Sequence, residues 1–232
     1  MDNKDGYGIL KDDKLLRTLD KDEALKFINE KEPCKIMHCH FRMATSGKIS
    51  QENVHLWKFD NVYFSHNGYV REYSNYNYPF RYYPFRYSYS YKEISTCDIN
   101  ESDSHLMFKS KDFLKHFNKL VKSVDKNTLR GVKALYTHLD NIGFYGIIMA
   151  NDYRYVYVIS NKKFNIYYHK GSVIFSNMPL YIGLTVKNGI QFQYHEEFCG
   201  VIIYDYISNK LVYMQEHMPK WSNYFGGDIY EY

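Results

Sequence analysis

The order of its periodic segments predicts an α+β fold with mostly antiparallel sheets. Short alternating or β-branched runs and one short helical stretch occupy the first third of the 232 residues, two longer stretches with helical spacing follow, and aromatic β-type runs return after Gly143. Strands followed by helices and then by strands favour antiparallel sheets covered by helices. With 45% hydrophobic residues, the chain is long enough to bury one sizeable core.

The N-terminal segment predicts a strand and a helix. Residues 6–10 are typical of a strand end, and the charged residues at 11–14 predict a turn. Asp20 and Glu23 have the spacing of a capping box ahead of a one-sided apolar helix face. Pro33 closes that helix, because the residue before a proline disfavours helical geometry.

Two further strands come next. Residues 35–42 predict a strand, and residues 61–65 predict another that runs into a turn at 66–68. Alternation along the first of these places three polar side chains on one face and Cys39 on the other. The three are His38, His40 and Arg42.

Residues 71–92 predict a loop, since they contain a tandem repeat with prolines five residues apart. The repeat units are Tyr78–Tyr82 and Tyr83–Tyr87. Apolar spacing then predicts one helix over 113–121 and another over 129–139.

The C-terminal half predicts a series of short strands. They are expected at 144–150, 155–160, 165–169 and 173–176, with about three more in 181–214 that include 201–204. We expect residues 1–180 to form the main domain and residues 181–232 to be a β extension packed on it.

Composition narrows the functional classes. The start of the chain is charged and no apolar run approaches the ~20 residues of a membrane span, which favours a cytoplasmic protein. The four scattered cysteines indicate reduced thiols, and a net charge of +4 is too small to indicate nucleic-acid binding. The 26 tyrosines are typical of a low-GC genome, such as that of a virus or phage.

Four ordered blocks resemble the signature of class-II glutamine amidotransferases, whose pattern runs H-x-R-x-A-T-x-G, N-x-H-P, H-N-G and S-D-[ST]. The blocks are His40-Phe41-Arg42-Met43-Ala44-Thr45-Ser46-Gly47, Asn53 with His55, His66-Asn67-Gly68, and Ser102-Asp103-Ser104. Leu56 departs from the usual proline, and the resemblance covers about residues 5–180. It implies a four-layer αββα sandwich of the N-terminal-nucleophile hydrolase type, with two mostly antiparallel sheets between helices.

The resemblance also implies roles for individual residues. Arg42 would hold the α-carboxylate of glutamine through charge-assisted hydrogen bonds, with help from Thr45, and Asp103 would hold the α-ammonium together with Gly68. The side-chain amide of Asn67 and the backbone N–H of Gly68 would form the oxyanion hole. No cofactor is implied.

The family's attacking group is a cysteine that becomes the N-terminal residue, with its own amine as the base. Here Met1 is followed by Asp2, and the family's D-G-x-G block, found a few tens of residues after that cysteine, already starts at Asp5. We therefore expect a truncated relative that lacks the first strand and the nucleophile.

Other readings of the same residues are less favoured. His38, Cys39 and His40 invite a metal site, but adjacent strand residues diverge and no C-x-x-C partner exists, so we expect no metal. The loop at 71–92 favours a protein contact, or no function, over stacking on nucleic acid. The edge left by a missing strand is a second place for a protein partner or for residues 181–232.

Two hypotheses follow. The first is a catalytically inactive class-II amidotransferase-like protein that acts as a binding or interaction module with a residual pocket for glutamine or a similar amino acid. The alternative is an active glutaminase or amidotransferase with a non-standard or partner-supplied nucleophile.

Overall fold

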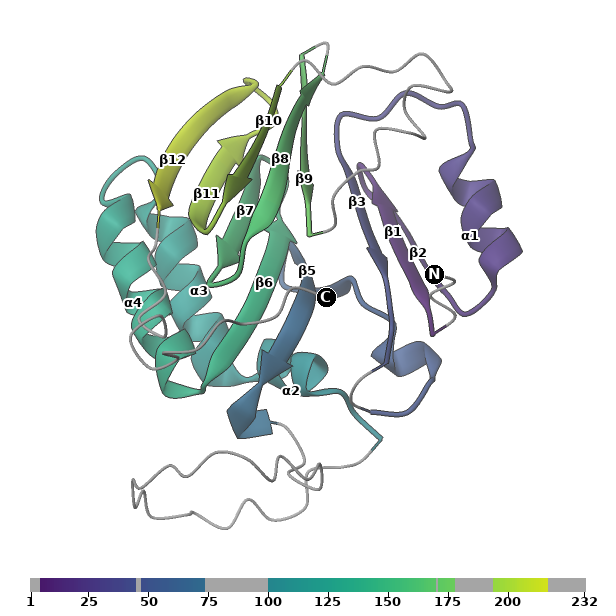
Figure 1. Cartoon of the computed structure of the whole chain (residues 1–232), viewed down its shortest axis with the longest axis horizontal. Coiled ribbons are helices and arrows are strands. Elements are labelled where there is room, and N and C mark those ends of the chain that lie inside the picture. Colours follow the sequence, from purple (N-terminus) through teal and green to yellow (C-terminus); the bar gives the residue numbers. More distant parts are fainter. Residues whose placement is uncertain (1–4, 45–46, 74–99, 170, 178–193, 217–232) are drawn as a thin grey trace.

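The computed structural model describes residues 5–44, 47–73, 100–169, 171–177 and 194–216. Within them the chain is an α+β sandwich of antiparallel sheets with helices on both outer faces (Figure 1). The predicted fold class is therefore confirmed. The prediction of a loop at 71–92 falls mostly outside the described residues.

The first strands form a three-stranded N-terminal sheet with the order β2-β1-β3. Its members are β1 (Tyr7–Lys11), β2 (Lys14–Thr18) and β3 (Met37–Phe41). Helix α1 (Lys21–Ile28) covers this sheet, and its N-cap Asp20 accepts the backbone N–H groups of Asp22 and Glu23. Asp20 therefore caps the helix as the sequence predicts, although the helix ends at Ile28, before Pro33.

Lys11 ties β1 to the end of α1. Its ammonium donates to the carbonyls of Phe27, Ile28 and Glu30, and the side chain is almost fully buried. The last carbonyls of a helix have no partner within it and carry its negative dipole end, so a buried cation is stabilised there.

A six-stranded central sheet forms the middle of the molecule. In spatial order its strands are β12 (Lys210–Glu216), β11 (Gly200–Asp205), β7 (Tyr155–Ser160), β6 (Phe144–Asn151), β5 (Val62–Val70) and β4 (Trp57–Phe59). One face packs against α2 (Asp103–Lys109), α3 (Lys111–Ser123) and α4 (Thr128–Asn141). Phe64, Phe108, Phe113 and Phe117 lie at the centre of that core.

The opposite face of the central sheet is covered by the N-terminal sheet and by a third sheet (Figure 1). The third sheet has the order β10-β8-β9, from β10 (Tyr194–Phe198), β8 (Phe164–His169) and β9 (Ser172–Ser176). Its core joins Ile166 to Ile147 and Val158, whereas Leu10 and Tyr63 join the N-terminal sheet to the central one. The four expected layers are present, with the second β layer divided into two sheets within the described residues.

One local prediction is wrong. Residues 66–68 do not form a turn, because β5 continues through them to Val70 and stays in register with β6. Gly68 lies opposite Gly146, with φ of 154° and 141°. Side chains at these two positions would collide, so the two facing glycines allow β5 and β6 to stay paired here and β5 to continue.

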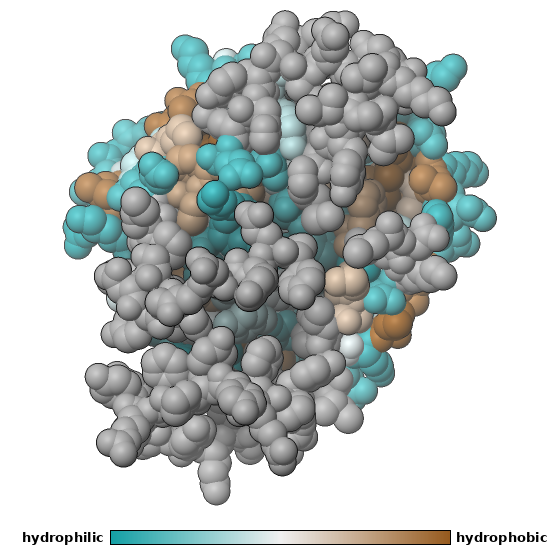
Figure 2. All heavy atoms as spheres, viewed as in Figure 1, coloured by the Kyte–Doolittle hydropathy of each residue, from teal (hydrophilic) through white to brown (hydrophobic). Residues whose placement is uncertain are grey.

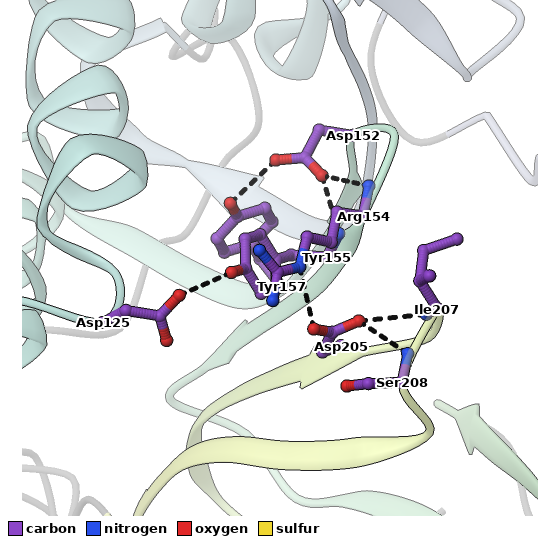
Figure 3. Close-up of polar contacts among 8 residues, drawn as sticks. All are labelled: Asp125, Asp152, Arg154, Tyr155, Tyr157, Asp205, Ile207 and Ser208. Atoms are coloured by element: carbon purple, nitrogen blue, oxygen red, sulfur yellow. Dashed lines mark hydrogen bonds and ion pairs between the residues drawn. The ribbon is translucent and has the colours of Figure 1, made fainter.

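A polar network connects two β-hairpin turns of the central sheet to the α3–α4 connection (Figure 3). Asp152 accepts the N–H groups of Arg154 and Tyr155 and the hydroxyl of Tyr157. The Arg154 guanidinium donates to Asp205 at 2.8 Å, and Tyr155 donates to Asp125 at 2.7 Å in the α3–α4 connection. These contacts hold the β6–β7 turn, the β11–β12 turn and the helical layer together.

Apolar residues gather at the right of Figure 2, over the region that β3, β1 and α1 occupy in Figure 1. The exposed apolar side chains of these elements include Leu25, Met37 and Phe41.

In the described ranges, no helix has the length and apolar character needed to cross a membrane.

Candidate functional site

The outer edge of β5 is the centre of the candidate site. β4 pairs only with residues 62–64, so the edge beyond it is open to other partners. In an antiparallel ladder, alternate residues direct their N–H and C=O groups to opposite sides. Gly146 uses both its N–H and its C=O in hydrogen bonds with Asn161, on the side away from β5. Gly68 and Gly146 therefore face each other without hydrogen bonds between them. The N–H groups of His66, Gly68 and Val70 therefore point to the outer edge.

Two of these three N–H groups are satisfied by side chains. The His66 N–H donates to Nδ1 of His55 at 3.3 Å, and the Val70 N–H donates to the Asp103 carboxylate at 2.8 Å. The Gly68 N–H lies between them and has no hydrogen-bond partner among the described residues. It is a donor held in place by its neighbours and left open.

Three histidines fix the peptide groups next to Asn67. His40 donates from Nε2 to the His66 carbonyl at 3.1 Å, while the His66 ring contacts the Ser104 hydroxyl through Nδ1 at 2.9 Å and the Tyr145 carbonyl through Nε2 at 3.4 Å. A carbonyl only accepts, so His40 and His66 are Nε2–H tautomers. His55 accepts a backbone N–H at Nδ1, so it is neutral with the proton on Nε2.

The rings also stack. His40 and His55 lie 3.7 Å apart between ring centroids at an interplanar angle of 12°, and His55 continues onto Trp57 at 4.3 Å. Burial lowers the pKa of all three histidines, and for His40 to about 3. The rings are therefore neutral at pH 7, which permits close stacking beside the positive charge of Arg42.

Asn67 and Gly68 themselves are open. Asn67 is partly exposed, and its amide makes no hydrogen bond within the part of the chain that the structure describes. A Cβ on Gly68 would lie 1.9 Å from the Tyr145 carbonyl, so only glycine fits there. The two residues predicted to form an oxyanion hole thus carry available donors.

Arg42 and Asp103, unlike Asn67 and Gly68, are buried and already hold other groups of the chain. Arg42 is 3% exposed, and its guanidinium donates to the carbonyls of Lys48 at 3.3 Å and Gly47 at 3.4 Å. Asp103 is 4% exposed and is the first residue of α2, after the N-cap Ser102. One of its carboxylate oxygens accepts the Val70 N–H. Burial lowers the pKa of Arg42, whereas the negative charges of Asp5 and Asp103 raise it. Arg42 and Asp103 are therefore close enough to interact electrostatically. Thr45 lies outside the described residues.

Asn53 and His38 have structural roles. The Asn53 side chain accepts the Ser102 N–H and donates to the Lys48 carbonyl, so it joins the segment under Arg42 to the start of α2. His38 bridges the N-terminal and central sheets through Asn151 at 2.8 Å and Ser65 at 2.7 Å. Among the described residues no cluster of three or more potential ligands is arranged to hold a metal ion.

Three cysteines lie in the described residues, Cys34, Cys39 and Cys199. Cys39 packs in the cluster under α1, opposite the His40 face, as the alternation predicts. Burial raises its pKa to about 11, and burial also raises the pKa of Cys199. Neither thiol is activated as a nucleophile.

Tyr69 and Tyr145 are not among the site residues that the sequence predicts. They form a cross-strand pair two residues beyond Asn67, with ring centroids 5.4 Å apart. The signal available in the sequence was an aromatic residue directly after the H-N-G block, but its partner was visible only once β6 was known to pair with β5 in this register.

Comparisons with known proteins found similar solved structures. No family model matches the chain, and no curated protein does. A solved glutamine aminotransferase class-II domain protein from Silicibacter pomeroyi is similar at 14% identity over 87% of this chain and 91% of that one, with a TM-score of 0.43. A predicted glutamine amidotransferase from Pseudomonas aeruginosa PA01 is similar at 11% identity over 90% and 87%, with a TM-score of 0.48. At these identities and TM-scores the two structures show a likeness and no function for this chain.

Proposed function

We propose that the chain is a catalytically inactive class-II amidotransferase-like protein that acts as a binding module, and that Asn67 and Gly68 receive the carboxamide of glutamine or of a related ligand. The observation that carries the proposal is the open Gly68 N–H, held between the satisfied N–H groups of His66 and Val70. Such a fixed donor costs little reorganisation when a carbonyl oxygen arrives.

Two of the three described thiols, those of Cys39 and Cys199, support binding rather than chemistry. A cysteine nucleophile must ionise, yet burial raises the pKa of both Cys39 and Cys199, and Cys39 faces the α1 side of its sheet. The alternative of an active glutaminase with another nucleophile makes a different prediction, namely release of ammonia.

Arg42, Thr45 and Asp103 are proposed to complete the pocket for the amino-acid end of the ligand. For Arg42 and Asp103 this requires exchange of their present contacts with Gly47, Lys48 and Val70. The bonds from Arg42 to the carbonyls of Lys48 and Gly47 are long, at 3.3 and 3.4 Å, and are therefore easier to exchange than bonds of ordinary length.

The test uses the full chain and its Asn67→Ala variant, with Asn118→Ala on α3 as the matched control on the far side of the central sheet. We expect glutamine to bind in a calorimetric or NMR titration, Asn67→Ala to weaken that binding about tenfold or more, and Asn118→Ala to leave it unchanged. Ammonia release is expected to be absent. Turnover of glutamine that Asn67→Ala abolishes would establish the active alternative, and no binding of any carboxamide would refute the proposed pocket.

A further inference from the structure

Tyr69 and Tyr145 form an aromatic surface next to the candidate carboxamide site. They face each other across β5 and β6, their rings are inclined by 33°, and they are 53% and 40% exposed. The 5.4 Å between ring centroids is too short for a third ring to enter between them, because stacked rings need about 3.5–4 Å on each side. The exposed parts of the two rings therefore form one surface.

Alternation places this surface on the same face of the sheet as the Asn67 side chain. Along β5, Tyr63 contacts Leu10 of the N-terminal sheet and Ser65 contacts His38, so the odd-numbered residues face the second β layer. Along β6, Ile147 and Met149 pack in the core with the third sheet, which gives Tyr145 the same direction. Asn67, Tyr69 and Tyr145 thus share one contiguous face.

The groups expected to recognise a free amino acid are not equally accessible. Arg42 and Asp103 are almost fully buried and already hold backbone groups of the chain. The carboxamide donors and the tyrosine pair are the exposed part of the site. A ligand that uses only the exposed part needs a carboxamide and an apolar ring, and it needs neither a free α-carboxylate nor a free α-ammonium.

We infer that the site binds a primary carboxamide attached to an aromatic or other planar apolar group, with the carboxamide at Asn67 and Gly68 and the ring against Tyr69 and Tyr145. The inference rests on the proposed function and names its ligand class. Aromatic contacts of this kind add up to about a factor of ten in affinity beyond area burial.

Three probes separate the contributions in an NMR titration of the full chain: glutamine, propionamide and 3-phenylpropionamide. We expect 3-phenylpropionamide to bind about tenfold more tightly than propionamide. Tyr69→Ala and Tyr145→Ala should each reduce this gain, while Tyr69→Phe should keep it. Tyr153→Ala, which removes an exposed tyrosine from the β6–β7 turn, is the matched control and should behave as the unaltered chain.

The outcomes are distinct. Equal affinity for the two amides, or a gain that survives both alanine variants, overturns the aromatic subsite. If Asn67→Ala still weakens propionamide binding in that case, the proposed carboxamide site stands without it. If none of the three probes binds, the proposed function and this inference both fail.

Discussion

Replacing His38 by glutamine should remove part of the acid sensitivity of the fold. His38 is buried between two sheets, and its contact with the side-chain amide oxygen of Asn151 makes it the neutral Nδ1–H tautomer, which accepts from Ser65 at Nε2. Burial lowers its pKa from 6.5 to about 4. A glutamine amide offers a donor and an acceptor for the same two partners, but it does not titrate.

The sign and size follow from linkage between protonation and folding. Between about pH 6.5 and pH 4 the unfolded chain binds the His38 proton and the folded chain does not, so stability falls as the pH falls through this window. From about pH 7.5 to about pH 5.5, one such histidine costs about 1.4 kcal/mol of the free energy of unfolding. His40, whose pKa is lowered to about 3, adds a similar amount in both proteins.

The measurement is urea unfolding of the unaltered chain and of His38→Gln at both pH values, followed by tryptophan fluorescence, since Trp57 is buried in the core. We expect the variant to lose about 1.4 kcal/mol less than the unaltered chain over this interval. The difference at the higher pH reports only the altered hydrogen bonds and serves as the internal control. An equal loss in the two proteins would refute the assignment of His38 as a buried, neutral bridge.

Three other substitutions test the packing. Gly68→Ala places a Cβ 1.9 Å from the Tyr145 carbonyl and should cost more than about 2 kcal/mol of unfolding free energy, measured by urea denaturation. Lys11→Met removes the donor to three carbonyls at the end of α1 and should cost about 1–3 kcal/mol, with earlier amide exchange in α1. Asp205→Ala breaks the Arg154 contact and the turn at Ile207 and Ser208, and should lower the thermal midpoint by several degrees in calorimetry.

The features predicted correctly from local sequence patterns are those that depend on residues close together in the sequence. The Asp20 cap and the alternation that separates Cys39 from His38 and His40 follow from backbone geometry, and both are confirmed. The turn predicted at the H-N-G block is wrong because a glycine after asparagine is typical of a turn, whereas here the strand continues opposite a second glycine 78 positions away in the sequence. The burial of Arg42 and Asp103 also depends on distant partners, Val70 and the segment at 47–48, that local spacing does not reveal.

The identity of Gly68 is explained by packing alone, since Gly146 and the Tyr145 carbonyl leave no room for a side chain whether or not a ligand binds. Its presence in the motif therefore carries little weight for function. Asn67 is different, because its amide is partly exposed and makes no contact, within the described residues, that the fold needs. A substitution at Asn67 should leave the unfolding free energy within about 0.5 kcal/mol of the original value. If replacing Asn67 abolishes ligand binding but leaves stability unchanged, Asn67 serves binding. If the replacement changes only stability, Asn67 serves the fold.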